Sequence, residues 1–238
     1  MPTLLISGTD TGVGKTLITS ALASYLEVYR PRQSFAIFKP IQSGLGDREH
    51  YAANFQLDQT LDQITPLYFQ APLAPPLAAA AENKAIDLAL AWSTFQSLQQ
   101  TRDWMLVEGV GGLGTPITAE LTVADLARDW RLPTILVVPV RLGAIGQAIA
   151  QVALARQTAV PVKGFILSCP DPVSEEQIQQ WAAPDLLQSF TQHPVLGVLP
   201  HLAGTFDKSA LAQLVSQWNL EVLLPDLYDV PKSWAKNR

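Results

Sequence analysis

The sequence contains a single cysteine, Cys169, so no disulfide can form within the chain and no site built from several cysteines can bind a metal. Such low cysteine usage is typical of proteins from reducing compartments. We expect a buried structural thiol, because Cys169 has no evident histidine partner that would activate it as a nucleophile. These features predict a cytoplasmic protein without covalent cysteine catalysis.

Long hydrophobic runs are also absent. The longest run, Leu132 to Val140, contains two prolines and is much shorter than the roughly 20 residues that a membrane span needs. The N-terminus has neither the basic start nor the cleavage signal of a secretory peptide, and its apolar residues fit a first strand. We therefore expect no membrane segment and no membrane partner.

Basic residues are few and dispersed. The chain has 16 Lys and Arg against 21 Asp and Glu, which gives a net charge of −5. This balance, without a basic cluster, offers no footprint for DNA or RNA. Small anions bound together with a metal ion remain possible ligands, because they need only local positive charge.

The pattern of the 238 residues, 48% of them hydrophobic, favours an α/β fold. Short apolar runs alternate with longer helical patterns, which is typical of a mostly parallel sheet flanked by helices on both faces. The expected strands are Leu4 to Ser7, Phe35 to Lys39, Trp104 to Glu108, Thr134 to Pro139, Val162 to Leu167 and Leu196 to Leu199. The expected helices are Lys15 to Tyr29, Ile86 to Gln100, Val123 to Trp130, Gly143 to Gln157, Glu175 to Gln180 and Lys208 to Trp218.

No repeat and no Gly/Ser linker divides the chain, so we expect one P-loop α/β domain over residues 1–238. The tail from Pro225 to Arg238 is expected to pack loosely, with Trp234 as a candidate for docking on the body of the domain. Three prolines make the stretch from Gln70 to Ala81 a rigid loop that enters a helix rather than a strand.

The most informative motif is the segment GTDTGVGKT at residues 8–16. It follows an apolar run and precedes an amphipathic helical pattern, and this order of strand, glycine turn and helix forms a phosphate cradle. Gly12 and Gly14 let the backbone approach an anion closely. Lys15 is then expected to reach the terminal phosphates, and Thr16 to bind magnesium. The segment therefore predicts nucleotide binding.

The glycine spacing of this motif is a variant of the usual G-x-x-x-x-G-K-[ST]. Thr9 occupies the position five residues before Gly14, and the first glycine, Gly8, stands one residue earlier. A Gly-Lys-Thr that arose by chance would not also have an apolar strand before it and an amphipathic helix after it. The context thus favours a genuine P-loop.

Polar residues follow the next two strands, where ligands of a parallel sheet collect. Lys39 and Ser43 belong to the turn KPIQSG, in which proline restricts the backbone. Glu108 precedes the glycine-rich turn GVGG, at the place where P-loop proteins usually keep a second magnesium contact. One loop carboxylate is needed to complete the magnesium shell, and the candidates are Asp47, Glu49, Asp58 and Asp62.

Four segments together resemble dethiobiotin synthetase: GTDTGVGKT at 8–16, KPIQSG at 39–44, VEGVGG at 107–112 and VVPVRLGAIGQA at 137–148. Their order and spacing extend across most of the chain. The resemblance implies an ATP- and magnesium-dependent ligase of biotin synthesis, which joins carbon dioxide to 7,8-diaminononanoate, closes the ureido ring and releases ADP and phosphate. It also implies a P-loop fold and a homodimer.

The resemblance implies roles for individual residues. Lys39 and Lys15 are expected to be catalytic, and Thr11 and Ser43 to contact the substrate. Magnesium ligands are expected to be Thr16, Asp47 and Glu108. Nucleotide contacts are expected from Gly12, Val13, Gly14, Lys15, Thr16, Leu17, Asp47, Glu108, Gly109, Val110, Gly111, Ser168, Pro200, His201 and Leu202.

Two parts of the substrate site are less closely specified. Family members commonly have an asparagine where this chain has Ser168, which predicts relaxed selectivity for the base of the nucleotide. We expect the proline-rich loop, residues 70–80, to line an apolar channel for the diamine chain. The segment Arg141 to Gly146 opens a helix, so it is either an anion site for the substrate's carboxylate or a plain helix cap.

Two other functions share the P-loop and stay open at this point. A cobyrinate-type amidation enzyme has the same variant loop, but it usually carries a glutamine-hydrolysing domain that this chain has no length for. A partitioning or switch ATPase often has an extra lysine at the start of the loop, where this chain has Gly8-Thr9-Asp10. Dependence of ATP hydrolysis on the diamine, rather than on DNA or lipid, separates the three.

Overall fold

The computed structural model describes residues 1–204 and 206–225. The tail expected to pack loosely, with Trp234, lies outside the described residues from position 226 onward. Within the described part, one sheet has the order β2-β5-β1-β6-β7-β8, and each neighbouring pair is parallel. The strands are β1 (Thr3–Gly8), β2 (Phe35–Phe38), β5 (Trp104–Gly112), β6 (Thr134–Pro139), β7 (Val162–Ser168) and β8 (Val195–Leu199). The predicted fold class is confirmed.

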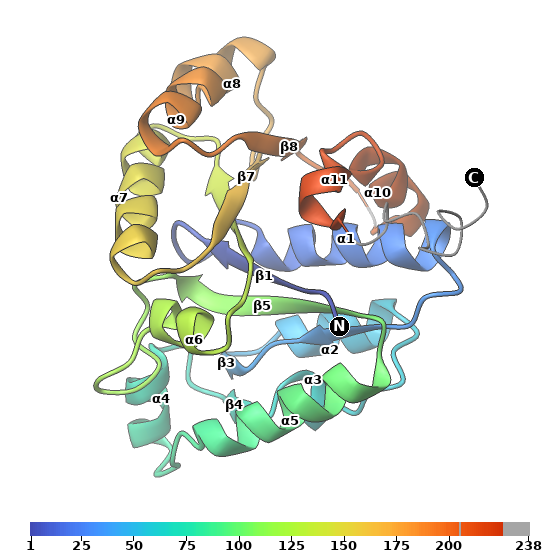
Figure 1. The fold of residues 1–238 in the computed structure, drawn as a ribbon, viewed down its shortest axis with the longest axis vertical. Coiled ribbons are helices and arrows are strands. Elements are labelled where there is room, and N and C mark those ends of the chain that lie inside the picture. The colour runs from blue at the N-terminus through green and yellow to red at the C-terminus, as the bar shows by residue number, and fades with distance from the viewer. Residues whose placement is uncertain (205, 226–238) are drawn as a thin grey trace, which may run out of the picture.

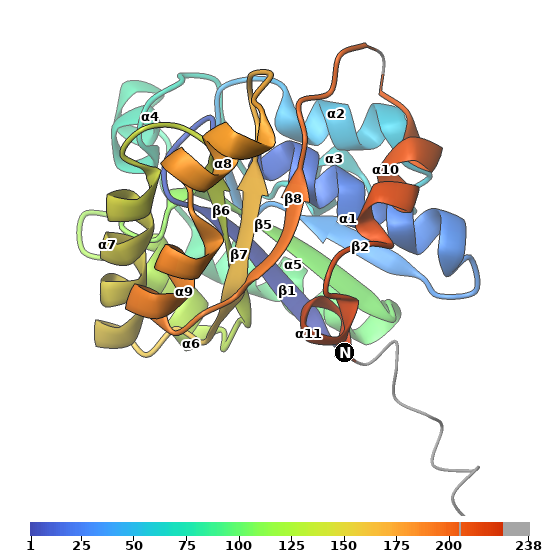
Figure 2. The same cartoon turned by 90° about the horizontal axis from the view of Figure 1, so that it is seen from above.

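Helices cover both faces of this sheet (Figures 1 and 2). The longer ones are α1 (Lys15–Tyr29), α5 (Leu88–Thr101) and α7 (Ala144–Gln157). The shorter ones are α2 (Asp47–Asn54), α3 (Leu61–Ile64), α4 (Pro75–Ala81), α6 (Val123–Asp129), α8 (Glu175–Trp181), α9 (Pro184–Thr191), α10 (Lys208–Val215) and α11 (Leu220–Leu223). None of the helices in the described ranges is long and apolar enough to cross a membrane.

Two hydrophobic cores lie on opposite faces of the sheet. Successive residues of a strand point to opposite faces, and accordingly Leu4 and Ile6 belong to one core while Leu5 belongs to the other. Helices α1 and α10 pack on the first face, and α5, α6, α7 and α9 on the second. Leu4, Leu5 and Ile6 are each at least 99% buried, as expected for a parallel sheet that is covered on both sides.

Helix α1 follows directly from the P-loop motif and shows why its sequence folds this way. Its buried apolar residues recur with the spacing of one helix face: Ile18, Ala21, Leu22, Tyr25 and Leu26. Gly14 is its N-cap, with φ of 95°. The observed helix has the bounds that the sequence predicts.

Several short elements were not predicted. Strands β3 (Ile41–Ser43) and β4 (Leu67–Phe69) form a separate parallel pair.

The bounds of three predicted segments differ from those observed. The proline-rich loop was predicted too long, because Pro75 and Pro76 occupy the first turn of α4, where a missing N–H costs no hydrogen bond. Residues 109–112, predicted as a turn, continue β5. Helix α10 ends at Val215, earlier than predicted.

Gly197 of β8 provides a test of the packing between the sheet and the C-terminal helices. A Cβ atom at this position would lie 2.4 to 2.6 Å from three ring atoms of Trp218, which is 7% exposed. We expect Gly197→Ala to lower the free energy of unfolding by about 1–3 kcal/mol. Gly146→Ala is the control, because its Cβ would meet nothing within 4 Å in helix α7 and should stabilise by about 0.5–1 kcal/mol. Urea denaturation measures both, and equal effects of the two variants would contradict the prediction.

Candidate active site

The P-loop lies between β1 and α1, as the sequence predicts. Gly12 and Gly14 have φ values of 71° and 95°, in the left-handed region that favours glycine. Because Gly14 caps α1, the first backbone N–H groups of the helix have no intrahelical acceptor and can bind an anion. The Lys15 ammonium donates to the Asp10 carbonyl oxygen at 3.1 Å. The loop thus combines free amides and a lysine beside the space that a phosphate would occupy.

Four side chains converge next to this loop. Lys39 follows β2, Glu108 lies on β5, Thr16 belongs to the first turn of α1, and Asp47 begins α2. The Lys39 ammonium lies between two carboxylates, 2.6 Å from Asp47 Oδ2 and 2.8 Å from Glu108 Oε1. The Thr16 hydroxyl lies 2.9 Å from Asp47 Oδ1 and 3.1 Å from Glu108 Oε1. They meet because β2, β5 and β1 are neighbours in the sheet.

Glu108 has a third partner on its other oxygen. The hydroxyl of Tyr51 donates to Glu108 Oε2. Tyr51 is fully buried, and Glu108 is 1% exposed. Tyr51 lies four residues after Asp47 in α2, so the two side chains share one face of that helix.

The site is strongly polar although most of it is buried. Burial alone would lower the pKa of Lys39, but the carboxylates of Glu108 and Asp47 outweigh burial and raise it. Burial would raise the pKa of Asp47, but the Lys39 ammonium lowers it instead. Burial lowers the pKa of Lys15 to about 8. Burial and the Glu108 carboxylate raise the pKa of Tyr51 well above its usual value, so its hydroxyl remains a donor.

Thr16, Asp47 and Glu108 fit magnesium by the chemistry of their oxygen atoms. Magnesium prefers oxygen ligands and is usually bound through one or two carboxylates together with substrate phosphates. One hydroxyl and two carboxylates meet here, with the hydroxyl within 3.1 Å of an oxygen of each carboxylate. Within the described ranges, no three His, Cys, Asp or Glu residues form a closed metal cage. The donor set therefore suits an ion shared between the protein and a nucleotide.

A cavity of about 590 Å³ opens over these groups. The predicted site residues that line it are Thr11, Gly12, Gly14, Lys15, Thr16, Leu17, Lys39, Ser43, Asp47, Glu108, Val110 and Gly111. The segment 72–75, from the proline-rich stretch, lines the same cavity, and so does Thr115. Among the predicted phosphate and magnesium contacts, two do not line it: Val13 is buried in a core, and Gly109 lies against Val123 and Leu5.

The predicted base contacts lie outside this cavity, at the ends of β7 and β8. Ser168 ends β7, and its hydroxyl lies 2.6 Å from the place of a Cβ atom on Gly14, so it is next to the P-loop. Pro200, His201 and Leu202 follow β8, where the His201 Nδ1 atom lies 2.7 Å from the Pro170 carbonyl oxygen. The two loops are thus joined to one another beside the P-loop.

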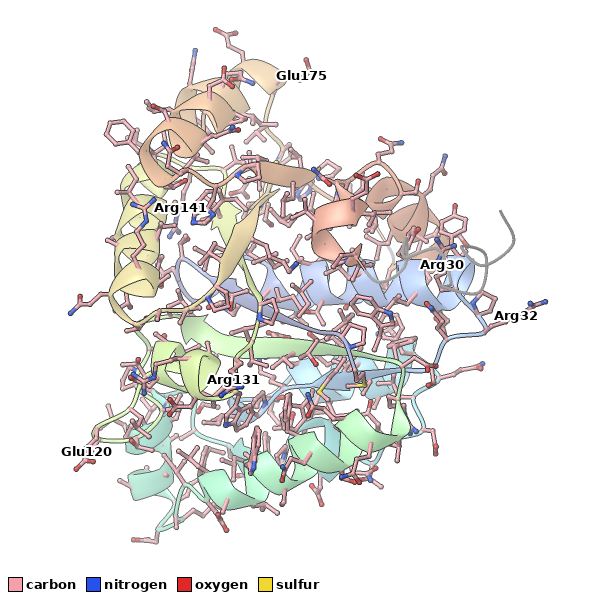
Figure 3. All side chains as sticks on the ribbon, viewed as in Figure 1. Arg30, Arg32, Glu120, Arg131, Arg141 and Glu175 are labelled. Atoms are coloured by element: carbon pink, nitrogen blue, oxygen red, sulfur yellow. The ribbon has the colours of Figure 1, made fainter. Side chains whose placement is uncertain are left out.

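A further polar contact links the P-loop to the start of α7. Arg141 follows β6 beside that helix (Figure 3), and its guanidinium lies 3.2 Å from Asp10 Oδ2. Gly143 is the N-cap of α7, with φ of 89° and no side-chain cap. The expected anion site and the plain helix cap are both compatible with this geometry.

Sequence reasoning missed Tyr51 and placed three of the four candidate carboxylates in a loop although they lie in helices. Asp62 belongs to α3. Asp47 and Glu49 belong to α2, where Glu49 accepts from the Gly46 backbone N–H at 3.1 Å. A carboxylate at the third position of a helix often caps the N-terminus of that helix, and the sequence contains this signal. With α2 assigned, the spacing of four residues would have placed Tyr51 beside Asp47.

Known proteins are similar to this chain over most of its length. A family described as an AAA domain matches residues 2–209. An ATP-dependent dethiobiotin synthetase BioD from Gloeothece citriformis is 50% identical over 225 residues, covering 94% of this chain and 100% of the relative. The enzyme of that name from Synechocystis sp. is 54% identical over 223 residues, covering 93% and 94%. The one from Bacillus subtilis is 30% identical over 228 residues, covering 92% and 96%.

Solved structures establish the fold alone. The cell division ATPase MinD of Pyrococcus furiosus has a TM-score of 0.57 and 14% identity, covering 94% of this chain and 100% of that chain. MinD of Aquifex aeolicus has a TM-score of 0.56 and 13% identity, with 97% and 99% covered. These likenesses confirm a P-loop fold. The sequence relatives extend over nearly the whole chain, so the protein belongs to the dethiobiotin synthetase family of ATP-dependent, C–N bond-forming ligases.

Proposed function

We propose that this chain catalyses the ATP-dependent carboxylation and ring closure of 7,8-diaminononanoate, giving dethiobiotin, ADP and phosphate in the cytoplasm. The observation that carries the proposal is the position of Lys39, buried between Asp47 and Glu108 on the rim that also holds the P-loop. A phosphate group and a carbamate that react there repel each other. Two lysines on one rim, Lys15 and Lys39, supply the positive charge that this reaction requires.

The chemistry proposed for the site has three steps. One substrate amine adds to carbon dioxide, releases a proton to solvent and forms a carbamate anion, which is a poor electrophile because its charge is delocalised. The carbamate oxygen attacks the terminal phosphate of ATP, ADP leaves, and a carbamic–phosphoric anhydride forms. The second amine attacks the carbonyl carbon, the five-membered ring closes and phosphate leaves, a step that proximity favours.

The protein's contribution is position and charge. The P-loop amides and Lys15 hold the terminal phosphates, and Lys39 stabilises the oxygens between carbamate and phosphate. Thr16, Asp47 and Glu108 would hold magnesium, which supplies further positive charge to the phosphates when bound. The Ser43 hydroxyl borders the cavity and has no hydrogen-bond partner among the described residues, which supports a contact with the diamine or its carbamate. Thr11 borders the same cavity and is proposed to help hold the diamine.

An ADP-release assay tests the proposal. We expect ADP formation to require the diamine, bicarbonate and magnesium together, and omission of any one to reduce it to background. A partitioning ATPase would respond instead to DNA or lipid vesicles, and an amidation enzyme to glutamine or ammonia with an acid substrate. ADP release that ignores the diamine would contradict the proposal.

Ser168 leads to a prediction on nucleotide selectivity. A serine offers one hydroxyl, whereas an asparagine amide presents a donor and an acceptor side by side to a base. We expect kcat/KM for CTP and GTP to lie within about tenfold of that for ATP, because fewer paired groups discriminate among bases. The variant Ser168→Asn should increase the preference for ATP, and Ser168→Ala is the control for loss of the hydroxyl. Strict use of ATP by the wild type would contradict this prediction.

We further propose that the protein works as a homodimer. Helices α4 and α7 lie on the same side of the molecule (Figure 1), and three exposed leucines belong to α4 or shortly precede one of the two helices: Leu73 is 47%, Leu77 61% and Leu142 86% exposed. Large apolar side chains left exposed are typical of an interface. Sedimentation equilibrium should give twice the chain mass of 25.9 kDa, and Leu142→Asp should give monomers, while Leu90→Asp on α5 should not. A monomeric wild type at working concentration would contradict the proposal.

A further inference from the structure

The Glu108 carboxylate is held at both oxygen atoms, but only one of them faces the reaction site. Oε1 accepts from Lys39 at 2.8 Å and from Thr16 at 3.1 Å. Oε2 accepts from the hydroxyl of Tyr51, a residue that the proposed chemistry does not use. Rotation about the terminal bond of a glutamate side chain is weakly restricted, so a carboxylate without fixed partners takes many orientations.

We propose that Tyr51 is a positioning residue of the magnesium site: its hydroxyl fixes Glu108 Oε2 and thereby directs Oε1 toward Thr16 and Lys39. The inference rests on the proposed function, since it concerns a metal ligand of that reaction. Partners that orient a ligating carboxylate act through the ligand without touching the ion. Tyr51 would therefore determine how tightly the site binds magnesium, not which substrate it accepts.

Helix α2 fixes the position of the Tyr51 hydroxyl. Asp47 and Tyr51 lie one turn apart on the same helix, so one rigid element carries a proposed ligand and the residue that orients another. The neighbouring His50 joins α2 to α1, with its Nε2 atom 3.0 Å from Ser20 Oγ. Ser20 Oγ donates to the Thr16 carbonyl oxygen at 2.7 Å, so His50 Nε2–H is the donor in that contact. Helix α2 is thus attached to α1 at His50 and to β5 at Tyr51.

Packing alone does not explain the tyrosine. Its ring belongs to the core that contains Phe55 and Ile64 and lies edge-on to His50 at 5.7 Å between centroids. A phenylalanine would fill that space equally well. A buried phenol hydroxyl is costly unless it is hydrogen-bonded, and here its acceptor is a proposed metal ligand. The hydroxyl, rather than the ring, therefore carries the proposed role.

The test is the variant Tyr51→Phe, which removes one oxygen atom and keeps the ring. Magnesium is titrated into the full chain in the presence of a non-hydrolysable ATP analogue, and the binding heat is recorded by isothermal titration calorimetry. This experiment measures metal affinity without any reaction. We expect the magnesium Kd to rise about 10- to 100-fold, with the affinity for the analogue in metal-free buffer unchanged within about twofold. The magnesium concentration for half-maximal turnover should rise in parallel, while KM for the diamine stays constant.

Two further variants make the result decisive. Tyr68→Phe removes a phenol oxygen from β4, outside the cavity, and should leave the magnesium Kd unchanged. In a Glu108→Gln background, Tyr51→Phe should cause no additional loss of metal affinity, because the two residues act as a pair. A magnesium Kd of Tyr51→Phe equal to that of the wild type, with or without a loss of stability in urea, would overturn the inference. The binding measurement contains no diamine, so it remains valid even if the proposed reaction fails in the ADP-release assay.

Discussion

Lys39→Ala should lower turnover by about 10²–10³-fold or more, because it removes a cation from the point where charge moves between carbamate and phosphate. Lys39 is 3% exposed and has two carboxylate partners, so solvent cannot substitute for it easily. We expect ATP affinity to change only a few-fold, because the P-loop amides and Lys15 remain. Single-turnover ADP release and nucleotide titration measure the two quantities separately.

Lys39→Gln distinguishes charge from length. Glutamine keeps much of the side-chain volume and a hydrogen-bond donor, so a loss equal to that of the alanine variant would assign the effect to the charge. Lys84→Ala is the control, since Lys84 lies 2.7 Å from Glu82 at a surface pair outside the cavity. Near-normal turnover of Lys39→Ala would remove Lys39 from the mechanism.

Glu108→Gln should reduce both stability and activity. The carboxylate accepts from three donors, Lys39, Thr16 and Tyr51, and a glutamine amide opposes at least one of them with a donor of its own. Removing one partner of a buried ion pair costs about 3–5 kcal/mol, and because Asp47 remains beside Lys39 we expect a loss near the lower limit. Urea denaturation checks stability, and the magnesium dependence of turnover, expected to shift to higher concentration, checks the site.

Asp129→Asn is a matched control for this loss. The Asp129 carboxylate lies 2.8 Å from the Arg128 guanidinium, the same distance that separates Glu108 from Lys39. The side chains of Asp129 and Arg128, however, are 55% and 44% exposed. Exposed pairs contribute about 0–1 kcal/mol, so the change should be small. Equal losses in the two variants would show that burial does not determine the strength of the Glu108 pair.

The sequence predicts elements well where one periodicity is long and uninterrupted. Helix α1 was predicted to the residue, and every strand of the central sheet except β5 to within one residue at each end, because buried positions recur along each of them. Strand β5 was predicted four residues short, because its last residues are the glycine-rich segment. Helix α2 was missed because only Tyr51 of its eight residues is buried, which leaves no apolar stripe to detect. Strands β3 and β4 have three residues each, too few to show an alternation.

The candidate site was predicted in the same uneven way. Motif residues such as Thr16, Lys39 and Glu108 could be assigned from their places at strand ends, and the structure brings them together. Tyr51, the hydrogen-bond partner of Glu108 Oε2, could not be assigned from the sequence, because its contact depends on how α2 packs against β5 and not on any local pattern. The segment 72–75 was expected at the cavity, but the helix that begins inside the proline-rich stretch was not.

The strand order keeps two tasks of the protein apart. Residues proposed to handle phosphate and carbamate come from β1, β2 and β5 on one half of the sheet, whereas those proposed to face the base follow β7 and β8 on the other half. Substitutions in the loop after β8 therefore lie on the other half of the sheet from Lys39 and Glu108, whereas a substitution of Ser168 would also contact Gly14 of the P-loop. We therefore expect the choice of nucleotide base to be separable from the chemistry proposed for Lys39 and Glu108.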